Sequence, residues 1–239
     1  MAGPVSDVTR KVSNDFKGIW DSHDRTRVGS EQRQRDLLRS THRFAYCISL
    51  FAKAATALEE HRRVFLQELA SDALHLVHVL MAGDGRAGSF YLRSLIENFW
   101  RHHYFKDHFV EYEWLTSRRK YYMTLKDLRD YCSWLTVFSG KLGDSLRALE
   151  TKYADLSKQV HSTSVRTLVL RDSLEQIKLS SAQATELAPV LREVFRDVIA
   201  LLAFANRDLF DGMHVNSQDF IKASLDVKRR ERLQADLAR

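Results

Sequence analysis

The sequence is poor in the residues that interrupt helices. Only 2 of its 239 residues are proline and 9 are glycine, whereas 44% are hydrophobic and 28% are charged. Proline removes a backbone donor and glycine costs conformational entropy inside a helix, so their scarcity permits long helices. The composition therefore predicts helix through most of the chain.

Cysteine and long apolar runs are also scarce. The two cysteines, Cys47 and Cys132, lie far apart, and no Cys-x-x-Cys or Cys–His spacing indicates a zinc site or a disulfide framework. Two buried thiols suit a reducing compartment. No run approaches the ~20 apolar residues that span a bilayer, and residues 1–20 lack a signal-like apolar segment. We expect a soluble, cytoplasmic protein that contacts no membrane.

The chain shows no internal repeat and no low-complexity linker. We therefore expect one all-α domain over residues 1–239, a bundle of about four long helices with shorter appended helices. The core bundle is predicted over residues 31–212, and a basic helix over 217–239 is predicted to be exposed or to face a partner. The net charge of +6 permits an anionic partner such as RNA but does not require one.

The stretch from Gly83 to His108 is the predicted centre of the bundle. A Gly-Asp-Gly turn separates a helix over 61–82 from an amphipathic helix, and so short a connection makes the two helices antiparallel. One face of the second helix is apolar, with Leu92, Leu95, Ile96, Phe99 and His103 at helical spacing. Arg93 and Glu97 lie beside that face, four residues apart, where their charges can pair.

A second polar group follows on a later helix. Tyr153, Ser157 and His161 are each four residues apart, so they form one file beside the apolar seam of that helix. A histidine at the carboxyl end of a helix gains proton affinity from the helix dipole and can exchange protons near neutral pH.

If these two helices pack together, the five side chains converge. Arg93 would then bind a phosphate and His161 would move a proton. The alternative is a buried polar network that holds the helices in register and has no chemistry. The sequence leaves both interpretations open.

The motifs RSLIE, which contains Arg93 and Glu97, and YADLSKQVH, which ends at His161, resemble motifs of the HEPN superfamily of bacterial helical nucleases and of toxin or phage-defence effectors. The resemblance covers about residues 60–210. It implies metal-independent RNA cleavage by attack of the 2′-hydroxyl, in a site completed by a homodimer. His161 matches the family's histidine. In that family an arginine and the histidine lie on one helix with four to six residues between them. No arginine precedes His161 at that spacing, so the guanidinium would come from Arg93 on the other helix.

Three function classes therefore follow. The first is a HEPN-like ribonuclease effector in phage defence or toxin–antitoxin systems, acting on RNA as a homodimer or with a partner protein. The second is a non-catalytic helical interaction or regulatory module. The third, and least favoured, is a metal-binding bundle using four side chains of the helix over 61–82, namely Glu68, Asp72, His75 and His78. No Glu-x-x-His pair and no phosphate-binding loop occurs, so we expect no metal and no cofactor.

The aromatic stretch over 109–138 has two interpretations. Its rings alternate with basic residues and would stack on bases, or they simply pack in the core. The core interpretation is favoured on frequency. The residues concerned are Phe109, Tyr112, Trp114, Tyr121, Tyr122, Tyr131, Trp134 and Phe138, with Arg118, Arg119, Lys120 and Lys126.

Overall fold

The computed structural model describes residues 7–22, 31–161, 170, 172–173 and 176–237. Short 3₁₀ turns follow the second and sixth helices, at Ala55–Ala57 and Thr136–Phe138. The α-helices are α1 (Asp7–Ser22), α2 (Gln32–Ala54), α3 (Glu60–Met81), α4 (Gly85–Phe105), α5 (Phe109–Ser117), α6 (Leu125–Trp134), α7 (Lys141–Val160), α8 (Ser181–Ala205), α9 (Arg207–Asp211), α10 (Val215–Ser224) and α11 (Val227–Leu237).

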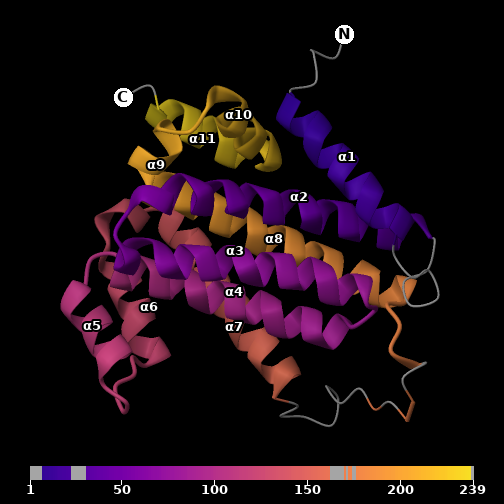
Figure 1. Ribbon diagram of the computed structural model, residues 1–239, viewed down its shortest axis with the longest axis horizontal. Helices are drawn as coiled ribbons and strands as arrows, with labels where there is room; N and C mark the ends of the chain where they lie inside the picture. Colours follow the sequence, from indigo (N-terminus) through magenta and orange to yellow (C-terminus); the bar gives the residue numbers. More distant parts are fainter. Residues whose placement is uncertain (1–6, 23–30, 162–169, 171, 174–175, 238–239) are drawn as a thin grey trace.

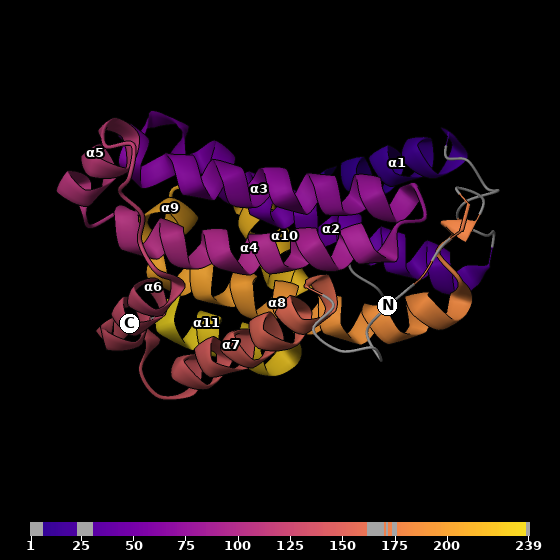
Figure 2. The same ribbon diagram turned by 90° about the horizontal axis from the view of Figure 1, so that it is seen from below.

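Four long helices form the bundle, which confirms the predicted all-α class. Helix α2 packs on α3 and α8, and α4 packs on α3 and α8, so the four close around one core. Helix α7 lies obliquely against α4 and α8, and α5 and α6 cover one end of the bundle (Figure 1). The view from below shows α7 beside α8, with α11 on the far side of α8 (Figure 2).

The turn between α3 and α4 is built from local hydrogen bonds. Gly83, at a φ of 83° that favours glycine, donates to the Leu80 carbonyl, and Asp84 donates to the Val79 carbonyl. The Asp84 side chain then caps α4 by accepting from the Ala87 amide at 2.9 Å. Two residues therefore end one helix and begin the next, and the predicted antiparallel pair follows from them.

The predicted apolar face of α4 is the centre of the core. All five residues predicted for it are fully buried, namely Leu92, Leu95, Ile96, Phe99 and His103. Gly88 of α4 lies so close to α3 that a Cβ atom there would be 2.9 Å from a methyl group of Leu80. The small residue therefore permits the close packing of α3 and α4.

The carboxyl-terminal segment differs from the single basic helix that the sequence predicts. Two helices, α10 and α11, occupy the described part of it, and α11 packs on α8. Arg229 of α11 forms ion pairs with Asp226 and with the buried Asp197 of α8. Arg229 therefore has a structural role within the bundle and is not simply exposed or partner-facing, because it neutralises a carboxylate that the bundle buries.

Candidate functional site

The predicted site lies where α4 crosses α7. Three contacts show how the two helices run relative to each other. Going toward the amino end of α4, each successive contact is with a residue nearer the carboxyl end of α7. Arg93 contacts Tyr153, Ser89 contacts Gln159, and Arg86 donates to the carbonyl of Val160 at 3.3 Å. The helices therefore run antiparallel here.

Arg93 joins the two predicted motifs. Its Nε donates to the Ser157 hydroxyl at 3.0 Å, and its Nη2 donates to the Tyr153 hydroxyl at 2.6 Å. Nη2 also lies 3.7 Å from a Glu97 oxygen. Four of the five predicted side chains therefore meet, and we call Arg93, Glu97, Tyr153 and Ser157 the α4–α7 cluster.

Glu97 has a second cation that the sequence interpretation missed. Arg101, one turn further along α4, donates to Glu97 at 2.6 Å, and the Tyr153 hydroxyl donates to the other carboxylate oxygen at 3.5 Å. Two guanidinium groups thus face one carboxylate, and the cluster with Arg101 has a net charge of +1. The four-residue spacing of Glu97 and Arg101 was the available signal.

The ring of Tyr153 contacts two other side chains. The Arg93 guanidinium carbon lies 4.8 Å from the centre of the ring, and the Trp100 ring meets its edge with centroids 5.2 Å apart. Arg93 and Glu97 retain side-chain exposures of 20% and 21%. The cluster is therefore a polar site that solvent still reaches, and the net charge of +1 that it has together with Arg101 suits an anion.

His161 lies apart from the hydrogen bonds of the cluster. It caps α7 through its backbone amide, which donates to the Ser157 carbonyl at 3.0 Å, and its side chain is exposed. Within the described residues its imidazole forms no hydrogen bond with the four clustered side chains. It stands one helical turn beyond Ser157, and Arg86 donates to the carbonyl of the residue before it.

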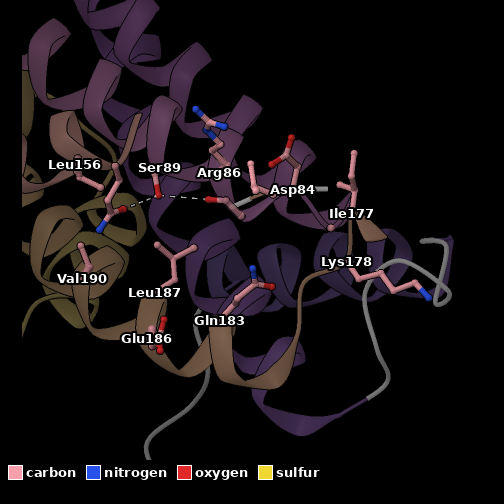
Figure 3. A pocket seen from close by; sticks show the side chains of 14 residues that line it. Asp84, Arg86, Ser89, Leu156, Ile177, Lys178, Gln183, Glu186, Leu187 and Val190 are labelled. Atoms are coloured by element: carbon pink, nitrogen blue, oxygen red, sulfur yellow. Dashed lines mark hydrogen bonds between the residues drawn. The ribbon is translucent and has the colours of Figure 1, made fainter. Parts of the chain in front are cut away.

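A pocket of about 640 Å³ opens one turn from the cluster, between the ends of α4, α7 and α8. Ser89 lines it from α4, and Leu187 and Gln183 extend from α8 on the opposite side (Figure 3). Arg86 and Lys178 point away from the centre in the same view. Helix α8 begins at this pocket with a capping box between Ser180 and Gln183. The sequence interpretation missed the pocket, because it gathers three distant segments.

Two of the four candidate metal-ligand residues, Asp72 and His75, form other contacts. Asp72 is buried and accepts from Asn98 of α4 at 2.8 Å, and burial raises the pKa of its carboxyl group. His75 stacks on Tyr91 with ring centroids 5.1 Å apart. No group of three or more His, Cys, Asp or Glu side chains is placed to hold a metal ion within the part of the chain that the structure describes.

The aromatic segment over 109–138 contains both buried and exposed rings. Tyr112 and Phe138 are buried in the core, whereas Tyr122 and Trp134 are 75% and 77% exposed. Arg118 lies over the Trp114 ring at 4.3 Å. Core packing therefore explains only part of this segment, and at the connection between α5 and α6 the exposed Tyr122 follows the exposed residues Arg118, Arg119 and Lys120 in sequence.

One described helix, α3, is long and apolar enough to cross a membrane by length and composition. Its apolar side chains Leu66, Leu69, Leu76 and Leu80 are fully buried between neighbouring helices. A core helix passes the same test, so its composition is explained by the bundle.

Comparison of the chain with protein-family models, with curated proteins and with solved structures found no match in any of the three.

Proposed function

We propose that this protein is a HEPN-like, metal-independent ribonuclease whose reactive groups lie along the α4–α7 crossing. The observation that carries the proposal is the pair of hydrogen bonds from Arg93 to Tyr153 and Ser157. They bring RSLIE and YADLSKQVH, distant in sequence, to one solvent-reached site with a net positive charge. A phosphodiester is the anion that such a site suits.

The proposed reaction needs only groups of this chain and of the RNA. His161 accepts the proton of a ribose 2′-hydroxyl, whose oxygen attacks the adjacent phosphorus atom. Arg93 neutralises the charge that builds on the phosphoryl oxygens. The bond to the 5′-oxygen then breaks, that oxygen takes the proton that His161 had accepted, and the products are a 2′,3′-cyclic phosphate and a 5′-hydroxyl.

The test is RNA cleavage by the purified protein with and without EDTA. We expect cleavage in both conditions, and a loss of at least 100-fold in His161→Ala, the scale on which a general base acts. Arg93→Lys keeps the charge but loses the two-point contact, and we expect a similar loss. His78→Ala, which removes an exposed histidine of α3, is the matched control. Absence of cleavage, or cleavage that survives His161→Ala, contradicts the proposal.

A second function has one observation in its favour. The hydrogen bonds of Arg93 join α4 and α7 in a single register, as a network that only holds the bundle together would do. In that case the protein is a non-catalytic interaction module. The wild-type protein and Ser157→Ala would then both fail to cleave RNA, and Ser157→Ala would lower the free energy of unfolding.

We further propose a homodimer formed through α3 and α4. Leu74 of α3 and Phe90 of α4 are 55% and 45% exposed on these paired helices, and Phe90 precedes Arg93 by three residues. A second copy on this surface would bring its own cluster near the first. Light scattering after gel filtration is the test. Phe90→Asp should yield monomers, whereas Val215→Asp, at another exposed apolar residue, should not.

A further inference from the structure

The pocket between α4, α7 and α8 has a size and chemistry that the cluster does not explain. Its volume of about 640 Å³ lies within the range of sites for small organic ligands. Part of its lining is apolar, formed by Leu156, Leu187 and Val190. A pocket of this kind holds a flat, mostly apolar group better than it holds a free ion.

Charge separates this pocket from the cluster. The lining has two cations, Arg86 and Lys178, and two carboxylates, Asp84 and Glu186, so it is neutral overall. The two cations also point away from the centre (Figure 3). The groups that remain near the centre are uncharged, namely a hydroxyl and side-chain amides. An uncharged ligand therefore fits the pocket, and the neighbouring cluster is the place for an anion.

One amide has a defined orientation. The Oε1 atom of Gln183 accepts a hydrogen bond from the backbone N–H of Ser180 at 3.0 Å. A backbone N–H group can only donate, so the Nε2 atom of Gln183 cannot occupy that position and faces elsewhere. Figure 3 draws this nitrogen pointing from α8 toward the side of the pocket that α4 forms. Gln159 accepts a hydrogen bond from the Ser89 hydroxyl at 3.1 Å through its own Oε1 atom. The N–H groups of its Nε2 atom are not used in that hydrogen bond. The pocket thus offers N–H donors to a ligand that has carbonyl acceptors.

The pocket and the cluster are one helical turn apart. Ser89 precedes Arg93 by four residues on α4, a rise of about 6 Å along that helix, and on α7 Leu156 directly precedes Ser157. One nucleotide spans that distance between its phosphate and its base. We propose that the pocket is a nucleobase subsite, with a preference for uracil because its two carbonyl groups match the amide donors.

This inference rests on the proposed function for its ligand, but it is tested by binding. The probes are the four nucleoside 3′-monophosphates, titrated against the intact protein by calorimetry. We expect the uridine nucleotide to bind about tenfold or more tightly than the adenosine nucleotide. Gln159→Leu should reduce that preference, and Leu187→Trp, which fills the pocket, should abolish binding. Matched controls are Gln32→Leu and Val215→Trp, at exposed residues of α2 and α10.

The two proposals fail in different ways. If RNA is cleaved but Leu187→Trp leaves cleavage and base preference unchanged, the subsite is wrong and the ribonuclease stands. If nucleotides bind in a manner that Leu187→Trp abolishes but no RNA is cleaved, the subsite stands and the ribonuclease is wrong. If no nucleotide binds, or if all four bind equally, the inference is overturned.

Discussion

Arg93 and Tyr153 are 60 residues apart in the chain and meet in two ways. The Nη2 atom of Arg93 donates to the tyrosine hydroxyl at 2.6 Å, and the guanidinium carbon lies 4.8 Å from the centre of the ring. The hydrogen bond needs the hydroxyl, whereas the ring contact needs only the aromatic face. The two contributions are therefore separable by mutation.

Tyr153→Phe should destabilise the protein by about 1–2 kcal/mol, because it removes the hydrogen bonds of the hydroxyl with Arg93 and Glu97 and keeps the ring. Tyr153→Ala should cost roughly 3–5 kcal/mol, because it also leaves a cavity beside Trp100. Urea denaturation measures both. Tyr122→Phe, at a ring that is 75% exposed, is the control and should have no effect. Equal losses for the two Tyr153 variants would contradict this division.

Two glycines should respond to alanine in opposite directions. Gly18 lies on the exposed face of α1, and a Cβ atom added there would have no neighbouring atom within 4 Å, so Gly18→Ala should stabilise the protein by roughly 0.5–1 kcal/mol. A Cβ atom at Gly143 would lie 2.9 Å from the carbonyl oxygen of Phe138, which is backbone. Gly143→Ala should therefore cost about 1–3 kcal/mol. Thermal unfolding of both variants is the measurement, and a stabilised Gly143→Ala would refute the contact.

Acid should destabilise the fold through two adjacent histidines. Burial lowers the pKa of His102 to about 4, and burial lowers the pKa of His103 well below its usual value. Between the ordinary value of 6.5 and the lowered values, the unfolded chain binds protons that the folded chain does not. Stability should therefore fall as pH drops from 6.5 to about 4, by roughly 3 kcal/mol for His102 alone.

Denaturation curves at pH 7 and pH 5 test this dependence. His103→Leu removes a fully buried imidazole that has no hydrogen-bond partner among the described residues, and it should reduce the loss between the two pH values. His78→Ala, at an exposed histidine, should not. A loss that is unchanged in His103→Leu would assign the acid sensitivity to other groups.

Arg229→Ala should be strongly destabilising, by roughly 2–4 kcal/mol, because it leaves the buried Asp197 carboxylate without its cation. Arg229 and Asp197 replaced together by Met and Leu should recover part of that loss, since no unpaired charge then remains. Lys228→Ala, at the neighbouring exposed lysine, should change stability by less than about 0.5 kcal/mol. Unfolding free energies from urea titration decide between these outcomes.

The sequence by itself determined the central helices of this protein. Helical spacing identified the buried face of α4, and Gly83 with Asp84 identified the turn that pairs α3 with α4. These signals are local, because hydrophobic periodicity and capping depend on residues within a few turns. The motifs around Arg93 and Tyr153 were visible for the same reason.

Only the tertiary structure decided which side chains meet. It joined Arg93 to Tyr153 and Ser157, and it left His161 exposed at the end of α7. It also turned Arg229 toward Asp197 and formed a pocket from three distant segments. Such pairings depend on the crossing of packed helices, which no spacing along one helix encodes.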